Sequence, residues 1–502
     1  MKPFSLGTDR LTWSKLTSLA SKPAPLVDVA ADAWTRLDFY REIVEKAISS
    51  GKVIYGINTG FGFLSDVRIE NDKLQTLQYN LIRSHACGVG ELAAAEYVRG
   101  LLILRAHTFL IGHSGVTRKT VETVLNFLKH DILPIVPMQG SVGASGDLAP
   151  LSHLALGLIG EGDVIYKGER MAAKEALRSS HVEPLVPSAK EGLSLINGTQ
   201  FMAVLGAFAV RDASILAESA DVIAALSLEA FRGTKSAFDP RIHSVREQPG
   251  QRKVAGRMLS LLSGKDEIME SHAGCNRVQD PYSFRCIPQV HGASRDVIEF
   301  VAARVDGDLN SVTDNPLVFE DGSVISGGNF HGQPLAMALD FLGIAVAELG
   351  SISERRIEKL TNPAMSGLPA FAINEGGLNS GFMIPHVVAA ALVSENKILC
   401  HPASVDSIPT SADKEDHVSM GPIAARKAIK ICAHVADVLS IEALTAAQGV
   451  DLQGPLKPSL PLTKVHDRIR QISPGMPVDR SLYPDILAVS LWIRSGGALD
   501  AQ

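Results

Sequence analysis

Long apolar stretches with few helix breakers, in the second half of the chain, constrain the fold most. Residues 201–231 and 293–312 are rich in Ala, Leu and Val, which predicts long helices. In 335–360 the apolar residues recur every three or four positions, the spacing of one helix face. Several of these helices are apolar on more than one face, so we expect them to lie inside a bundle or between subunits. Their length favours one long helical bundle over several small domains.

The first 200 residues are more often interrupted by glycine and proline. Helices are predicted there at 30–48, 71–84, 92–112 and 117–130. Residues 164–171 are typical of a small hairpin around Lys167-Gly168. Further helices are predicted at 386–400 and 421–447, and the proline-containing tail is expected to be less regular. We therefore predict three parts that form one integrated unit: 1–200, 201–450 and 451–502.

Composition excludes several classes of protein. The 502 residues carry a net charge of −6, which gives no electrostatic argument for nucleic acid or an anionic membrane. The N-terminus lacks the continuous apolar core of a signal peptide, and the uncharged run 376–394 contains Gly381 and Pro385 and is a poor membrane span. The five cysteines form no Cys-x-x-Cys pair and indicate reduced thiols. We expect a soluble, cytoplasmic protein.

Residues 140–153 combine a glycine-rich turn with the start of a helix. Four small residues precede Asp147, a plausible N-cap, and Pro150 suits a first helical turn. The positive end of the helix would stabilise an anion, or make a group held there more electrophilic. From the residues alone, the interpretation stays open between a structural turn and an anion site.

Other familiar motifs are missing. Ser145 lacks the second glycine spacing of Gly-x-Ser-x-Gly, which argues against a serine hydrolase. No glycine-rich stretch has the spacing of a phosphate-binding P-loop, and no pair of histidines has the spacing of a zinc site. We assign no metal.

Three further segments are candidates for chemistry. Residues 55–63 hold three glycines and an asparagine, which predicts a loop that starts at Tyr55. Gln279, Tyr282 and Arg285 are spaced by three, which predicts one helical face. Arg285 can clamp a carboxylate, although a structural ion pair is the default role of a lone arginine.

The full set of motifs resembles the histidine and aromatic amino-acid ammonia-lyase family. The matching segments run in family order from about Tyr55 to Met420, and 140–153 matches almost residue for residue. By this resemblance, Ala144, Ser145 and Gly146 cyclise into a methylidene-imidazolone (MIO) ring when the Gly146 nitrogen attacks the Ala144 carbonyl. The resemblance implies no dissociable cofactor.

The resemblance also implies roles for individual residues. Tyr55 would remove the β-proton, Arg285 would bind the substrate carboxylate, and Asn197 would hydrogen-bond the ring or that carboxylate. Gln279 and Tyr282 would line the site, and Phe330 would pack by the ring with Asn329 near it. Since a phenol titrates near pH 10, Tyr55 needs surroundings that stabilise its phenolate.

Two positions favour histidine as the substrate among the family's amino acids. Histidine lyases carry Ser-His where this chain has Ser84 and His85, and Glu415 is lacking from the aromatic lyases. A carboxylate such as Glu415 can hold an imidazole by a charge-assisted hydrogen bond. The family's usual Gln before this glutamate is Lys414 here, which places a cation where it can pair with Glu415.

The resemblance therefore implies conversion of L-histidine to trans-urocanate and ammonia, the first step of histidine degradation. The implied fold is mainly α, with an elongated central helical bundle of the fumarase and aspartase type and a loop-rich N-terminal part that carries the ring. The implied assembly is a homotetramer with shared active sites. The alternatives are a tyrosine or phenylalanine ammonia-lyase, an aminomutase of the same family, a fumarase-like lyase and a catalytically silent helical scaffold.

Overall fold

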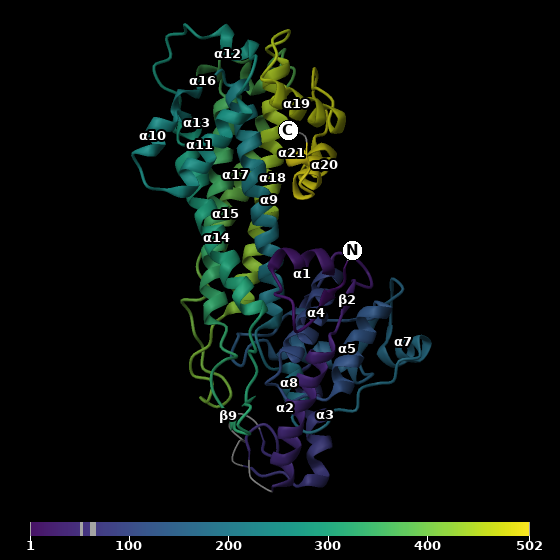
Figure 1. The fold of residues 1–502 in the computed structure, drawn as a ribbon. Helices are drawn as coiled ribbons and strands as arrows, with labels where there is room; N and C mark the ends of the chain where they lie inside the picture. The colour runs from purple at the N-terminus through teal and green to yellow at the C-terminus, as the bar shows by residue number, and fades with distance from the viewer. Residues whose placement is uncertain (1, 51–53, 61–66, 501–502) are drawn as a thin grey trace. The chain divides into compact units, whose positions relative to one another are not determined.

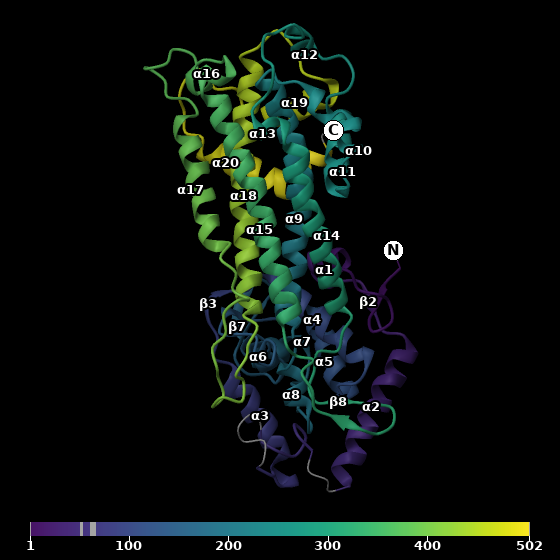
Figure 2. The same ribbon diagram turned by 90° about the vertical axis from the view of Figure 1, so that its left-hand side faces the viewer.

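The computed structural model describes residues 2–50, 54–60 and 67–500, and these form two compact units. Unit 1 comprises 1–208, 302–340 and 402–426, and unit 2 comprises 209–301, 341–401 and 427–502. Figures 1 and 2 show the elements of both units from two directions. The chain enters and leaves each unit several times, so neither is a continuous piece of sequence.

Unit 1 holds the short helices and the strands. Its helices are α1 (Trp13–Ala20), α2 (Ala31–Ser49), α3 (Leu74–His85), α4 (Ala95–Ile111), α5 (Arg118–His130), α6 (Leu148–Leu158), α7 (Ala173–Ser180) and α8 (Glu191–Ile196), with a 3-10 turn at Asn71–Lys73. The four helices predicted in this part are confirmed to within about three residues at each end. Helix α5 begins where the Thr117 side chain accepts the amide hydrogen of Thr120, an N-cap for which threonine is well suited.

The strands of unit 1 form small sheets. They are β1 (Phe4–Ser5) with β2 (Val27–Asp28), β3 (Val89–Leu92) with β5 (Pro137–Gln139), β4 (Leu133–Pro134) with β6 (Asp163–Tyr166) and β7 (Glu169–Ala172), and β8 (Leu317–Val318) with β9 (Val324–Ile325). All pairs are antiparallel except β1 with β2. The predicted hairpin is β6 and β7, and its turn residues Lys167 and Gly168 both have positive φ, as a tight hairpin turn requires.

Unit 2 is built on helices. They are α9 (Gln200–Ala230), α10 (Pro240–Ser244), α11 (Pro249–Leu261), α12 (Glu267–Ser271), α13 (Tyr282–Arg285), α14 (Ile287–Leu309), α15 (Gln333–Thr361), α16 (Pro363–Ser366), α17 (Met383–Leu399), α18 (Gly421–Asp451), α19 (Leu460–Ile472), α20 (Tyr483–Arg494) and α21 (Gly497–Asp500), with 3-10 turns at Lys235–Phe238 and Ala370–Ala372. The long helices α9, α14, α15 and α18 have residues in both units.

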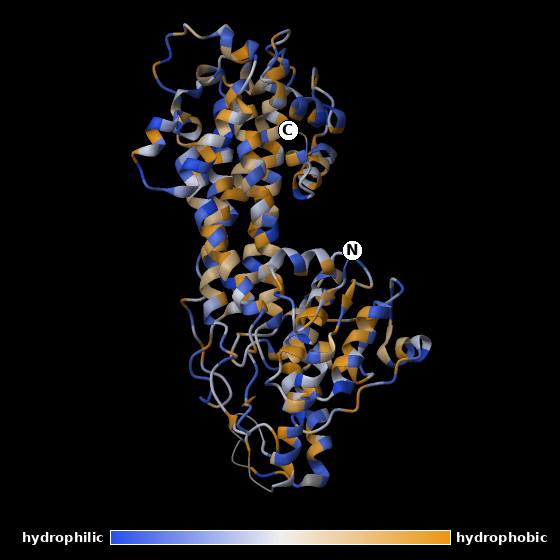
Figure 3. Cartoon of the chain, viewed as in Figure 1, coloured by the Kyte–Doolittle hydropathy of each residue, from blue (hydrophilic) through white to orange (hydrophobic). Residues whose placement is uncertain are grey.

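The long helices lie side by side as a bundle, in agreement between Figures 1 and 2. Apolar residues run along their whole length (Figure 3), and nearly every side chain of α9 is buried. Helices α9 and α15 are long and apolar enough to span a membrane, but 83% and 67% of their most apolar windows are buried within the protein. They are core helices, and the predicted mainly α fold with a helical bundle is confirmed.

The C-terminal tail is more regular than expected. It contains α19, α20 and α21, and in the first two a proline occupies the first turn. Proline is tolerated there because the first amide groups of a helix have no partner within the helix. Two of the prolines that indicated irregular structure, Pro461 and Pro484, therefore mark helix starts. The three-part division of the chain stays a prediction.

Candidate active site

A cavity of about 610 Å³ within unit 1 collects residues from five separate segments of the chain. The segments are the loop that follows α2, the second half of α3, the turn before α6, the end of α8 with Asn197, and the loop before α18. The lining residues with polar side chains are Tyr55, Asn80, Ser84, His85, Ser145, Asn197, Ser411 and Glu415. Five of the predicted site residues thus share one cavity.

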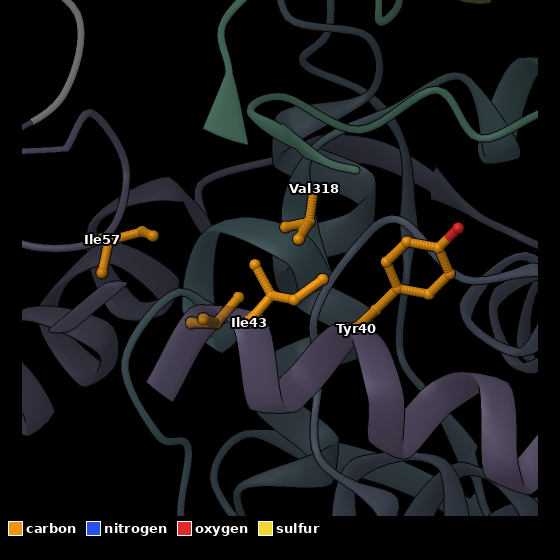
Figure 4. Packing of buried hydrophobic residues seen from close by; sticks show 5 residues of the cluster. Tyr40, Ile43, Ile57 and Val318 are labelled. Atoms are coloured by element: carbon orange, nitrogen blue, oxygen red, sulfur yellow. The ribbon is translucent and has the colours of Figure 1, made fainter. Parts of the chain in front are cut away.

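The loop that carries Tyr55 is anchored by apolar packing. Ile57 is fully buried in a cluster with Tyr40, Ile43 and Val318 (Figure 4). Gly56 has φ of +73°, and a Cβ there would lie 2.7 Å from the Leu193 side chain, so only glycine fits. These contacts fix the backbone that directly follows Tyr55. The last residues of the predicted loop, 61–63, lie outside the described residues.

The turn with Ala144, Ser145 and Gly146 is packed against the backbone of Gly198. Gly198 donates its amide hydrogen to the Ser145 carbonyl at 3.3 Å and accepts one from Asp147 at 2.8 Å. A Cβ on Gly146 would lie 2.2 Å from the Gly198 oxygen. The close approach explains why residue 146 is glycine, and it leaves the Ser145 side chain on the cavity wall.

Asp147 occupies the N-cap position of α6, as predicted, but its side chain does not cap that helix. It accepts the amide hydrogen of Met202 at 2.9 Å instead, in the first turn of α9. Burial raises the pKa of Asp147 to about 8, although the amides of Met202 and Phe201 oppose this rise. The predicted N-cap position is thus correct, but the predicted capping hydrogen bond is wrong. The Asp147 side chain bonds to α9 and not to α6.

Glu415 connects the turn at Ser145 to the loop before α18. Ser145 Oγ donates to one Glu415 oxygen at 3.1 Å, and Thr410 Oγ1 donates to the other at 2.8 Å. The loop between Thr410 and Glu415 contains three consecutive non-glycine residues with positive φ, at 411–413. Such backbone is strained and is found at functional sites, where the surrounding structure holds it. The Lys414 side chain is exposed, and Glu415 uses its oxygens on the two hydroxyl groups.

His85 lies at the end of α3, on the cavity wall. Its Nδ1 lies 2.9 Å from the Leu81 carbonyl, which can only accept, so Nδ1 carries the proton and Nε2 is an acceptor. Burial lowers the pKa of His85, and the Leu81 carbonyl and the Glu415 charge partly offset this lowering. A neutral imidazole and a carboxylate thus face the same space, a suitable environment for a polar ring with a hydrogen-bond donor.

Asn197 follows α8, is 4% exposed and lines the cavity. Its Oδ1 is buried without a hydrogen-bond partner in the described part of the chain. Its carbonyl accepts from the Arg105 guanidinium at 3.1 Å, and Arg105 also donates to Gln200 Oε1 at 2.6 Å and to the Ser194 carbonyl. An unsatisfied buried acceptor is costly, so Asn197 Oδ1 is available for a ligand.

Gln279, Tyr282 and Arg285 belong to unit 2 and line a separate hollow of about 540 Å³. The Arg285 guanidinium lies over the Tyr282 ring at 4.4 Å. The predicted common helical face is wrong, since α13 comprises only Tyr282–Arg285. Pro281 is its N-cap, and the residue before a proline is disfavoured in a helix, so Gln279 lies outside.

Asn329 and Phe330 lie in a loop of unit 1 between β9 and α15 and do not line the cavity. Asn329 is exposed, and its Nδ2 donates to the Val312 carbonyl at 3.2 Å. Phe330 is half-buried. Their roles stay predictions.

The sequence analysis did not identify several residues that line the cavity or support its walls. Thr410, Ser411 and Asn80 contact Glu415 or line the cavity, and Arg105 holds the segment around Asn197. The polar run before Glu415 was a usable signal for the first two. Arg105 lies in the middle of the apolar helix α4, where a charged residue needs a buried partner.

No group of three or more His, Cys, Asp or Glu side chains suited to a metal ion occurs among residues 2–50, 54–60 and 67–500. The five cysteines are free thiols.

The chain is similar to known lyases over almost its whole length. The profile of the aromatic amino acid lyase family matches residues 11–471. A histidine ammonia-lyase of Sorangium cellulosum is 51% identical, over 98% of this chain and 97% of that protein.

Two solved structures share the fold. The histidine ammonia-lyase of Trypanosoma cruzi has a TM-score of 0.92 and 47% identity, over 100% of this chain and 95% of that one. A tyrosine aminomutase of Streptomyces globisporus has a TM-score of 0.93 and 37% identity, over 99% and 98%. The backbone is thus shared between different reactions, while sequence identity is higher to the histidine enzyme. With these matches and the cavity described above, the chain belongs to the aromatic amino acid lyase family and is a carbon–nitrogen lyase.

Proposed function

We propose that this protein eliminates ammonia from L-histidine and releases trans-urocanate. The observation that carries the proposal is the meeting of His85, Ser145 and Glu415 at one cavity, with Glu415 joined to Ser145 at 3.1 Å. His85 and Glu415 together offer an acceptor and a carboxylate to a substrate imidazole. The relatives named histidine ammonia-lyase, at 51% and 47% identity, support the same substrate.

We further propose that Ala144, Ser145 and Gly146 form the MIO ring of this family. One feature fits such a ring: Gly146 has no Cβ where one would meet the Gly198 oxygen, so the turn can pack closely against that backbone. When present, the ring would supply an electrophilic methylene carbon that activates the substrate amine for departure. The Ser145 side chain, from which that carbon would derive, is on the cavity wall.

The positions of the other residues support the roles that we propose for them. Tyr55 would take the β-proton, because it lines the same cavity as Ser145 on a well-anchored backbone. Asn197 would donate from its side-chain amide to the ring or to the substrate carboxylate, and its unpartnered buried Oδ1 could accept from the substrate amine. Glu415 and His85 would hold the imidazole, and so fix the β-carbon toward Tyr55.

We propose a homotetramer whose copies share active sites. Arg285, Tyr282 and Gln279 line an open hollow of unit 2, where Tyr282 is 70% exposed. A second copy would bring this arginine to the substrate carboxylate. Exposed apolar residues on α14, α15 and α17 support burial between copies: Phe300, Phe341, Ile344, Ile384, Val387 and Ile398. Phe330 and Asn329 would border the completed site.

A small soluble substrate and the reduced thiols fit a cytoplasmic enzyme that needs neither nucleic acid nor membrane. Within the family, a tyrosine or phenylalanine lyase or an aminomutase is the second candidate, because the aminomutase of known structure has the same backbone. The pair His85 and Glu415 favours histidine over these.

The proposal is tested by following urocanate formation in the near ultraviolet, with L-histidine and L-tyrosine as substrates. Wild-type protein should act on histidine only and should lack two water molecules by intact mass. Ser145→Ala should keep the full mass and be inactive. Glu415→Gln should lower kcat/KM for histidine by about 100-fold, the effect of losing one charged hydrogen bond or more.

The control is Asp416→Asn, which removes the neighbouring exposed carboxylate and should act as wild type. A product from tyrosine and none from histidine would overturn the substrate. A wild-type protein of full mass and without activity on any aromatic amino acid would overturn the reaction.

A further inference from the structure

One hydroxyl group contacts both ends of the segment that contains Ala144 and Ser145. Ser141 Oγ accepts the amide hydrogen of Gly143 at 3.0 Å and donates to the carbonyl of Gly146 at 3.1 Å. The same oxygen atom thus accepts from one end of the segment and donates to the other.

This contact folds the segment back on itself. Three extended residues span roughly 10 Å, whereas here both ends are within one hydrogen bond of Ser141 Oγ. Gly143 and Gly146 have φ of +72° and +75°, the left-handed region that allows such a turn. The fold brings the start and the end of the tripeptide together.

Neighbouring segments hold the turn from outside, but each touches one side of it. Ser419 Oγ donates to the Gly143 carbonyl at 3.3 Å, and the Gly198 backbone contacts Ser145 and Asp147. In the described part of the chain, Ser141 alone is hydrogen-bonded to both Gly143 and Gly146. The Gly146 carbonyl belongs to the peptide bond with Asp147, whereas the Gly146 nitrogen belongs to the peptide bond with Ser145. The hydrogen bond from Ser141 therefore polarises the first of these peptides and not the nitrogen.

We propose that Ser141 is a positioning residue for the self-cyclisation of Ala144, Ser145 and Gly146. This inference rests on the ring formation proposed above. The Gly146 nitrogen forms a bond to the Ala144 carbonyl carbon, and its proton passes to the carbonyl oxygen. That oxygen leaves as water with the Ser145 amide hydrogen, which forms the C=N bond. A second water takes the Ser145 hydroxyl and its α-hydrogen, which forms the exocyclic C=C bond.

Ring closure depends on how often the nitrogen meets the carbonyl carbon, and a preorganised turn raises this frequency. Without the Ser141 hydroxyl, the Gly143 amide and the Gly146 carbonyl separate and the turn opens more often. The completed ring has a covalent bond in place of this constraint, so catalysis by the mature enzyme depends on Ser141 far less than ring formation does.

The test measures dehydration and catalysis separately. The full chain is made by cell-free translation, samples are denatured at intervals, and intact mass gives the fraction that lacks two waters. Ser141→Ala should lengthen the half-time of dehydration by about tenfold to a hundredfold, from the loss of two hydrogen bonds. Ser141→Thr keeps the hydroxyl and should restore a near wild-type half-time. Activity divided by the dehydrated fraction should stay within about threefold of wild type.

Ser152→Ala is the matched control, since it removes a neighbouring serine hydroxyl that donates within α6, to the Leu148 carbonyl. It should dehydrate like wild type. If Ser141→Ala fails to fold, Ser141→Cys keeps the shape and donates weakly, and it should be as slow. An unchanged half-time in the Ala or Cys variant, or equal slowing by Thr, would overturn the role of Ser141. A wild-type chain that never loses water would instead overturn the proposed ring.

Discussion

Buried charged side chains have different structural roles in the two units. In unit 1 they hold loops in place around the cavity, whereas in unit 2 they join one helix to another. Both sets are desolvated, so each charge must be paired to be tolerated. Pairing of buried charges thus supports an irregular site in unit 1 and a regular helical bundle in unit 2.

In unit 1 the partners lie in loops and in the short helix α8. Lys190, fully buried, contacts Asp314 at 3.0 Å and Ser194 Oγ at 2.9 Å. Arg105 donates to the backbone carbonyls of Ser194 in α8 and of Asn197, which directly follows that helix. Burial lowers the pKa of Arg105 to about 10, and nearby Asp314 and Asp147 oppose this, so the guanidinium stays charged at neutral pH.

In unit 2 the partners are side chains on different helices. Arg356 of α15 pairs with Glu442 of α18, which also accepts from Ser227 of α9 at 2.7 Å. His291 of α14 contacts Asp221 of α9 at 2.7 Å. These pairs fix the register of helices whose apolar faces alone would allow sliding.

The largest expected effect is in unit 2. Arg356→Met leaves Glu442 buried without its cation, so the free energy of unfolding should fall by about 3–5 kcal/mol. Arg355→Met is the milder comparison, because that arginine is 55% exposed and its buried partner Glu354 keeps His386 at 2.8 Å. Urea midpoints measure both variants. Since Ala144, Ser145 and Gly146 lie in unit 1, the Arg356→Met protein should still lose two waters. An Arg356→Met protein that keeps its full mass would show that the buried charges of unit 2 also support the site in unit 1.

Arg105→Lys should lower stability by about 2–3 kcal/mol, the effect of losing one or more charged hydrogen bonds. It should also slow dehydration of the Ala144 to Gly146 segment, because Gly198 loses the support of its neighbours. Intact mass and urea unfolding check the two effects. If the Arg105→Lys protein is less stable but loses water as fast as wild type, the loop holds Gly198 in place without the guanidinium.

Glu229 of α9 has no exposed surface, and its burial, with the facing Asp266 carboxyl, raises its pKa to about 10. The folded state then binds a proton that the unfolded state releases above pH 4.5, so stability should fall as pH rises from 4.5 to 10. This group contributes a slope of up to about 1.4 kcal/mol per pH unit. Glu229→Gln should remove that slope between pH 6 and 9 in urea unfolding.

Glu267→Gln is the control for this slope. Its partner Lys265 lowers the pKa of Glu267, so its contribution is lost only at acid pH and the slope from 6 to 9 should stay as in wild type. A Glu229→Gln protein with the wild-type slope would mean that Glu229 is ionised when folded.

The smallest effect is expected at a helix cap in unit 2. Asn362 accepts the amide hydrogen of Ala364 at 3.1 Å at the start of α16. Asn362→Ala should lower the free energy of unfolding by about 1 kcal/mol and leave dehydration unchanged. A loss well above 2 kcal/mol, measured by the urea midpoint, would show that this cap supports more than one short helix.

Local signals predicted the elements well. The breaker-free runs gave α9 and α15, and the Lys167-Gly168 turn gave the β6 and β7 hairpin. Local signals failed where a side chain bonds to a residue far away in the sequence. The Asp147 side chain, for example, accepts the amide hydrogen of Met202. The small sheets β1 with β2 and β3 with β5 were not predicted, because two- to four-residue strands carry almost no periodic pattern.

For the site, residue types and motifs were enough to select Tyr55, Ser145 and Glu415, but not their supports. The sequence by itself determined the helical bundle and the lyase family, because periodicity and the motif around Ser145 are local properties. Only the tertiary structure decided that Glu415 meets Ser145 and that Ser141 spans the turn. Hydrogen bonds depend on distances of about 3 Å, and packing, not spacing along the chain, fixes those distances.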